Sequence, residues 1–157
     1  MADAGAMSHY LAEKIINASL RGNDFTAPST SDLHLALFTD DPTNEGDTDR
    51  EVKDPWYSRK TASDWVSPSV DDEDRMRTYN GSSVTFDAVE EPDQDNDDYS
   101  GSFDSDDKYT IEITHVALFD ASSSGNMLYH EELVTPKTLE VGDVISFAEN
   151  ALVFRLD

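Results

Sequence analysis

Apolar residues near the N-terminus recur at the spacing of a helix. The stripe consists of Leu11, Ile15, Ile16, Ala18 and Leu20. Ser8 is a suitable N-cap, and Arg21 followed by Gly22 is a typical C-terminal stop. The pattern predicts one amphipathic helix after a flexible arm of residues 1–7. The apolar stripe of this helix either covers a sheet or docks onto another subunit.

Beyond this helix the pattern changes to short apolar runs bounded by Asp, Pro, Gly or Asn, which is typical of strands joined by turns. We expect strands at 33–38, 56–61, 84–86, 109–119, 127–134, 144–147 and 151–156. One helix followed by about seven short strands predicts a mainly β fold, a single β-sandwich that occupies residues 8–157.

Two of the predicted strands carry nearly the same sequence, LALF at 35–38 and VALF at 116–119. Each run is almost uninterrupted in its apolar character, and an acidic residue follows soon after. Such runs are typical of central strands that are buried on both faces, and the acid marks where the strand leaves the core. A shared environment in the fold explains why the two stretches are similar. An internal duplication of the sequence is the alternative.

Acidic residues dominate the segments between the predicted strands. We expect acidic loops at 43–55, 63–82 and 87–107, and the last contains ten acidic residues and no basic one. The whole chain has 34 Asp and Glu against 11 Lys and Arg, a net charge of -23. At about 1 M salt the Debye length falls to ~3 Å, which screens the repulsion within such a surface. The charge therefore favours a halophilic protein over an ordinary acidic mesophilic one.

The composition also excludes several classes of partner and site. Nucleic-acid binding needs clustered Lys and Arg, so no nucleic-acid partner is expected. No segment is apolar for long enough to cross a bilayer, so no membrane insertion is expected. The chain has no cysteine, which removes disulfides and thiolate metal ligands.

Side chains that could support catalysis do not form a recognisable motif. The four histidines are scattered, and no pair has the spacing of a metal-binding helix. Ser122, Ser123 and Ser124 lie in a predicted turn that lacks the Gly-x-Ser-x-Gly elbow. The sequence therefore predicts neither an enzyme nor a cofactor site.

One acidic stretch has part of the spacing of a calcium loop. Asp93, Asp95 and Asp97 alternate, and Asp104 occupies the twelfth position of that register. However, Asp98 stands where an EF-hand loop needs glycine, Asp104 replaces the bidentate glutamate, and no flanking helices are predicted. A solvated acidic loop is the preferred interpretation, and a site for calcium or another hard cation is the alternative.

Aromatic residues in the middle of the chain raise the question of a binding surface. Exposed rings could form a platform for a glycan or a protein partner, whereas buried rings would pack in the core. The rings are Trp56, Tyr57, Trp65, Tyr79 and Tyr99. Together with the helical stripe they give these candidate interface residues: Leu11, Ile15, Ile16, Leu20, Trp56, Tyr57 and Trp65.

Several segments of the chain resemble a family of small virion proteins of tailed viruses, usually described as phage tail-fibre proteins. The matching segments are YLAEKIINASLRG (10–22), LALFTDDPT (35–43), YSRK (57–60), ITHVALFDASSSGNMLYHEEL (113–133) and PKTLEVGDVISFAENALVFRLD (136–157). They include the predicted helix and most of the C-terminal third. The acidic segments 63–82 and 87–107 depart from the shorter middle region of the family.

The resemblance implies a non-enzymatic structural protein on the virion surface, with no catalytic residues to carry over. It would serve as a tail-fibre component, a capsid decoration protein or a turret, and the acidic surface adds a halophilic archaeon as the host. We expect synthesis in the host cytoplasm at high salt and assembly as a symmetric homo-oligomer, through the helix and the apolar strand faces, beside other virion proteins. A module that recognises host-surface glycans or glycoproteins is the alternative.

Overall fold

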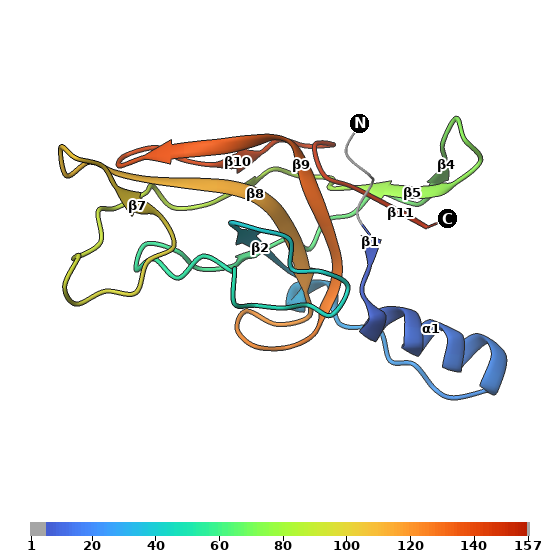
Figure 1. Cartoon of the computed structure of the whole chain (residues 1–157). Helices are drawn as coiled ribbons and strands as arrows, with labels where there is room; N and C mark the ends of the chain where they lie inside the picture. The colour runs from blue at the N-terminus through green and yellow to red at the C-terminus, as the bar shows by residue number, and fades with distance from the viewer. Residues whose placement is uncertain (1–5, 157) are drawn as a thin grey trace.

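The computed structural model describes residues 6–156, which form one α-helix and several antiparallel sheets (Figure 1). The helices are α1 (His9–Arg21) and the short 3-10 helix η1 (Thr30–Asp32). The strands are β1 (Ala6–Met7), β2 (His34–Phe38), β3 (Lys60–Thr61), β4 (Ser69–Val70), β5 (Met76–Tyr79), β6 (Val84–Thr85), β7 (Ser102–Phe103), β8 (Tyr109–Phe119), β9 (Met127–Glu140), β10 (Ser146–Phe147) and β11 (Val153–Leu156). The predicted mainly β, sandwich-like fold with one N-terminal helix is confirmed.

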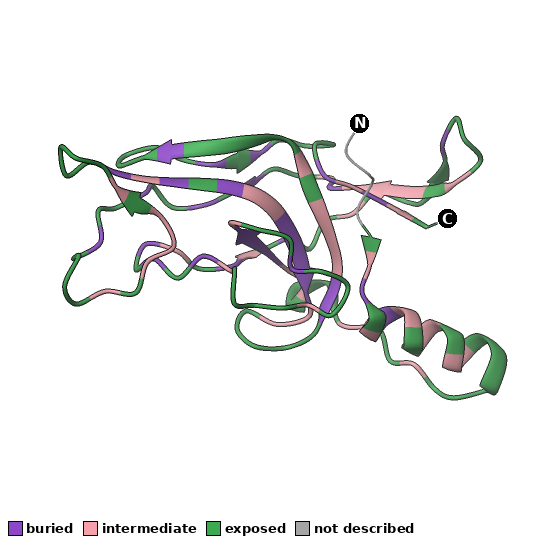
Figure 2. Ribbon diagram, in the orientation of Figure 1, coloured by how far each residue is buried: buried purple, intermediate pink, exposed green. Residues whose placement is uncertain are grey.

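The largest sheet has the strand order β1-β9-β8-β2-β3, and β7 also pairs with β8. β2 and β8 are antiparallel neighbours with Ala36 opposite Ala117, so the two Ala-Leu-Phe stretches lie side by side. Leu37 faces the main core, whereas Phe38 belongs to a second buried cluster on the other face. As predicted, these strands are central and buried on both faces (Figure 2).

Two smaller sheets form the second layer, β10 with β6, and β11 with β5 and β4. The main core contains side chains from all three sheets and from the connecting segments. Its largest fully buried members are Leu35, Leu37, Val89, Tyr109, Ile111, Ile113, Val116 and Leu152. The layered arrangement follows from the apolar face that each sheet must remove from water.

A bulge divides the long hairpin of β8 and β9. Lys137 of β9 lies opposite Ile113, but Glu132 lies opposite His115, so residues 133–136 face a single residue of β8. On β8, the residues that face the main core have odd numbers up to Ile113 and even numbers from Val116 onward. The bulge therefore changes which alternate residues of the strand face inward. Beyond the bulge, β9 continues to Glu140, whereas the expected strand ends at residue 134.

The helix is capped as the sequence predicts. The Ser8 side chain accepts from the backbone N–H of Leu11 at 3.1 Å, and Gly22 adopts the left-handed conformation at φ 69°. The Ser8 hydroxyl also donates to the carbonyl of Met127 at 2.5 Å, which fixes the start of α1 to β9. No helix within residues 6–156 is long and apolar enough to cross a membrane.

Other expected boundaries differ from the structure. Ala6 and Met7, expected in a flexible arm, pair with β9, and residues 1–5 of that arm lie outside the described residues. Of the expected strand 56–61, only Lys60–Thr61 is a strand. The expected loop 63–82 contains β4 and β5 because β5 pairs with β11 along its whole length, and 87–107 contains β7.

Candidate functional site

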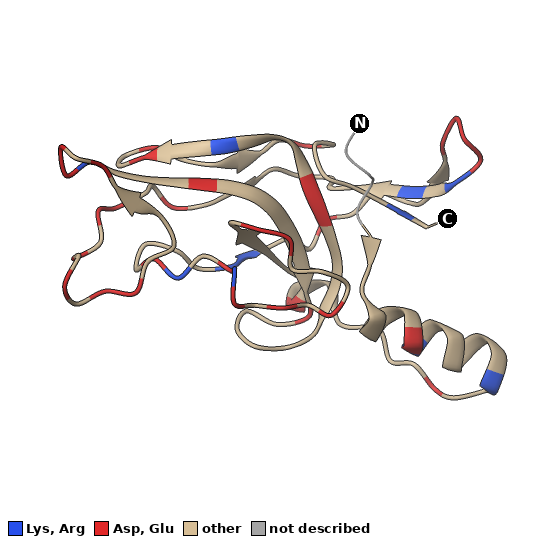
Figure 3. Ribbon diagram, in the orientation of Figure 1, with Lys and Arg blue, Asp and Glu red and all other residues tan. Residues whose placement is uncertain are grey.

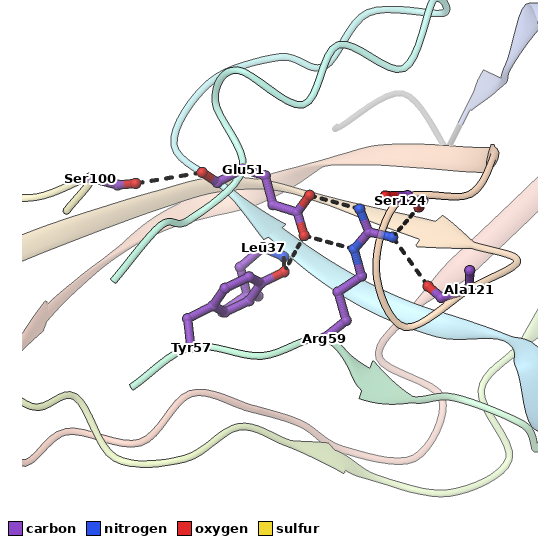
Figure 4. Close-up of polar contacts among 7 residues, drawn as sticks. All are labelled: Leu37, Glu51, Tyr57, Arg59, Ser100, Ala121 and Ser124. Atoms are coloured by element: carbon purple, nitrogen blue, oxygen red, sulfur yellow. Dashed lines mark hydrogen bonds and ion pairs between the residues drawn. The ribbon is translucent and has the colours of Figure 1, made fainter. Parts of the chain in front are cut away.

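A buried polar cluster joins Glu51, Tyr57 and Arg59, and we call it the Arg59 cluster (Figure 4). Arg59 binds the Glu51 carboxylate twice, from Nε to Oε1 at 2.7 Å and from Nη2 to Oε2 at 2.8 Å. The Tyr57 hydroxyl donates to Glu51 Oε1 at 2.8 Å and accepts from the backbone N–H of Leu37 at 3.2 Å. Only 4% of the Arg59 side chain and 14% of the Glu51 side chain are exposed.

Arg59 also holds the turn between β8 and β9. Its Nη1 donates to the carbonyl oxygens of Ala121 at 3.1 Å and Ser124 at 2.7 Å. The guanidinium lies over the ring of Phe119. All three guanidinium nitrogens donate hydrogen bonds. The Arg59 cluster thus connects β2, the loop carrying Glu51 and the β8–β9 turn.

Tyr57 and Arg59 both have raised pKa values. Burial, reinforced by the Glu51 carboxylate, raises the pKa of Tyr57 far above its usual value. Burial works to lower the pKa of Arg59, but the bonds to Glu51 outweigh it and the pKa is raised. Neither side chain therefore exchanges a proton near neutral pH, so the arrangement serves structure better than acid–base catalysis.

A second buried carboxylate, Asp54, attaches the acidic segment 87–107 to the core. It accepts from Trp56 Nε1 at 2.9 Å, from the backbone N–H of Ser100 at 2.7 Å and from the Tyr109 hydroxyl. The Tyr109 hydroxyl accepts in turn from the backbone N–H of Gly101 at 2.9 Å. A Cβ at Gly101 would lie 2.2 Å from the Thr110 carbonyl oxygen, so this close approach requires glycine.

The calcium-loop candidates close turns of their own. Asp93 Oδ1 accepts from the backbone N–H of Asp95 at 3.0 Å, and Asp97 Oδ2 accepts from that of Asp93 at 2.7 Å. Asp104 belongs to another turn, where it accepts from the backbone N–H groups of Asp106 at 2.8 Å and Lys108 at 3.0 Å. Within residues 6–156, no group of three or more His, Asp or Glu is placed to hold a metal ion. Cation binding stays a prediction, without a preformed site in this part of the chain.

Of the two alternatives for the aromatic residues, the structure favours packing inside the fold over an exposed platform for most of the rings. Trp56 is 6% exposed and belongs to the core, and Tyr57 belongs to the Arg59 cluster. Trp65 packs on Phe154 at 5.3 Å between ring centroids, and Tyr99 packs edge-on against Tyr109 at 6.0 Å. These contacts remove much of the apolar area of the rings from water. Glycan recognition stays a prediction, and of the candidates Trp56, Tyr57 and Trp65, it is Trp65 that lines an open groove.

The helical interface candidates lie around an apolar groove of 330 Å³ between α1 and the sheets. Its walls include Leu11, Ile15, Phe25, Trp65, Tyr129 and Phe154. Leu11 is the only buried residue of α1, whereas Ile16 is 54% exposed and Leu20 is 80% exposed. The structure thus brings Leu11, Ile15 and Trp65 together, and Trp56 and Tyr57 lie elsewhere in the core.

Sequence reasoning did not single out Asp54, Glu51 or Arg59. The only signal was YSRK, a short stretch with two basic residues in a strongly acidic chain. The partners of Arg59 lie up to 65 residues away, so their convergence depends on tertiary structure.

The same fold can be compared with known families. A family model described as podophage GP4 fiber I protein gp80 matches residues 6–155, which include α1, every sheet and both buried polar clusters. The chain belongs to this phage fibre family. A comparison with curated proteins gives no match. Membership of the phage fibre family confirms the tail-fibre-type resemblance and indicates a structural, virion-associated protein.

Proposed function

We propose that the protein is a fibre subunit on the surface of a tailed-virus particle whose host is a halophile. The observation that carries the fibre role is the family match across residues 6–155, nearly the whole chain. The buried carboxylates Glu51 and Asp54 support a non-enzymatic role, because their hydrogen bonds hold loops and turns together. Other virion proteins are the expected partners.

The halophilic host is supported by how charge is distributed. Acidic residues gather in the exposed loops, whereas several cations are already paired (Figure 3). Arg59 binds Glu51, Lys60 binds Asp87 at 2.6 Å, and Arg155 binds Asp71 at 3.2 Å. The remaining negative surface suits synthesis in a cytoplasm at multimolar salt, where the repulsion is screened.

The test is immunogold electron microscopy of intact particles in high salt, with an antibody against the 87–107 segment. Label confined to the tail is the expected result. Label over the head would overturn the fibre position and indicate a capsid decoration or turret protein. Unlabelled particles would overturn the virion-surface assignment, provided that the purified protein binds the antibody in the same buffer.

A further inference from the structure

We propose that copies of this chain associate through one end of the molecule, which we call the end surface. It is formed by α1, the hairpin of β4 and β5, and β11, and these elements lie at the end opposite the β7 loops (Figure 1). The occupant of the surface is a second copy of the chain. The inference goes beyond the fibre role and is tested on the purified protein.

Exposed apolar side chains are concentrated on the end surface. Of the nine large apolar residues that are exposed within residues 6–156, five belong to its elements. They are Ile16, Leu20, Val70, Met76 and Leu156. The groove beside α1 continues toward Met76 and Leu156, since Thr78, Tyr129 and Phe154 also line a second hollow that includes these two residues. Apolar surface gathered in this way is typical of an interface between proteins.

Within residues 6–156, α1 is packed along only part of its length. Its first turn is anchored by Ser8 and Leu11, but Ile16 and Leu20 face solvent farther along the helix. Isolated helices of about 13 residues are marginal in water, and most helices in proteins depend on packing of their apolar face. A second copy placed on the end surface would supply the missing contacts.

Charge directs a second copy to the same place. The end-surface elements, residues 9–21, 69–79 and 153–156, carry five acidic and five basic residues. Their net charge is therefore zero, and the remainder of the chain carries the whole formal charge of -23. Figure 3 shows basic positions on β5 and β11 beside the acidic β4–β5 turn, and both basic and acidic positions on α1. Two copies repel each other least when they meet through this end.

The end surface also presents opposite charges that can meet across a contact. Arg77 lies opposite Arg155 in the β5–β11 pair. Like charges that face each other across two strands destabilise the pairing unless carboxylates neutralise them. Arg155 is paired with Asp71 at 3.2 Å, whereas the guanidinium carbon of Arg77 lies 5.1 Å from the centre of the Tyr79 ring, and its buried Nε has no hydrogen-bond partner within residues 6–156. Arg77 also lines the second hollow, next to Met76 and Leu156. The exposed residues 72–74, all acidic, lie on the turn of the same hairpin. The acidic turn of one copy is therefore complementary to Arg77 of the next.

The first experiment is sedimentation velocity of the purified protein in 3 M KCl, over a concentration series. We expect a concentration-dependent oligomer whose dissociation constant rises at least ~10-fold in Leu20→Glu. The matched control is Val134→Glu, because Val134 is 82% exposed on β9, outside the end surface. A wild-type protein that stays monomeric at every concentration would overturn the proposal, as would equal effects of the two substitutions.

The second experiment tests the charge contact independently of the helix. Arg77→Glu should weaken association in the lowest KCl concentration at which the variants stay folded, where charge contacts are screened least. Mixing this variant with an Asp72→Arg variant should restore association, because each would supply the charge the other lacks. Circular dichroism and the melting temperature of each variant check that it is folded. Oligomers that are unaffected by both Leu20→Glu and Arg77→Glu would place the interface elsewhere.

Discussion

The guanidinium carbon of Arg59 lies 3.7 Å from the centre of the Phe119 ring. Phe119 is the last residue of β8, and Arg59 binds the turn that follows it. Buried Arg is tolerated here because the Glu51 carboxylate neutralises it and two backbone carbonyls accept from Nη1. The contact therefore fixes where the long hairpin turns.

Replacing Arg59 should be strongly destabilising. In Arg59→Ala the Glu51 carboxylate loses its cationic partner and keeps only the Tyr57 hydroxyl, so we expect a loss of about 3–5 kcal/mol in the free energy of unfolding. Urea denaturation in constant 3 M KCl measures this free energy of unfolding. The double variant Arg59→Met with Glu51→Gln removes both charges. Its free energy of unfolding should therefore fall by less than that of Arg59→Ala. An Arg59→Ala variant as stable as the wild type would contradict the structural role of the cluster.

Stability should depend steeply on salt. Because the net charge is -23, raising KCl from 0.2 M to 3 M should raise the melting temperature by roughly 10 °C or more. Differential scanning fluorimetry measures this directly. The variant Asp95→Asn, Asp98→Asn and Asp106→Asn should show a smaller increase, since it has less repulsion to screen. A flat profile for the wild type would remove the argument for a halophilic host.

Glu131 makes stability depend on pH. Burial raises the pKa of Glu131 from 4.5 to about 7, against the opposing effects of the Val153 N–H group and Arg155. The folded protein therefore favours the protonated form, so the contribution of this residue is most favourable below about pH 4.5 and declines as the pH rises to about 7.

The substitution Glu131→Gln should remove this dependence. At pH 8 it should raise the free energy of unfolding by on the order of 2–3 kcal/mol, and at pH 4.5 it should have little effect. Urea titrations of both proteins at the two pH values measure the difference. Equal effects at both values would mean that the substitution acts through packing.

Removal of calcium should leave stability unchanged. The carboxylates of Asp93, Asp97 and Asp104 already accept backbone N–H groups in their own turns. A chelator added at constant ionic strength should therefore not shift the melting temperature, and added calcium should not raise it at that ionic strength. A reproducible shift that disappears in Asp93→Asn would instead support the calcium-loop interpretation.

The helix and the central strands could be predicted because their signals are local. Ser8 and Gly22 cap α1 at the predicted positions, and β8 has its predicted bounds, Tyr109–Phe119. β5 was missed because Met76–Tyr79 has little apolar character, and its stability comes from pairing with β11. Pairing with a strand more than 70 residues away leaves no mark on the local pattern.

Buried polar residues were the least predictable part. Asn80-Gly81 has the composition of an exposed turn, yet Asn80 is 1% exposed. Its side chain donates to the carbonyls of Ser82 and Ala148 and accepts from the backbone N–H of Leu152. Such roles are set by which distant segments converge, and the sequence around Asn80 does not contain that information.

The pairing of β2 with β8 has a consequence for how the chain is made. The partner of Phe38 is His115 and that of His34 is Phe119, so β2 leaves the ribosome roughly 80 residues before its partner strand. At about 5–20 residues per second, that interval is on the order of 4–16 s. During it, a strand with four consecutive apolar residues, Leu35 to Phe38, has no native neighbour on its β8 side. The growing chain therefore depends on chaperones, or on the solubility of its acidic segments, until the hairpin of β8 and β9 is complete.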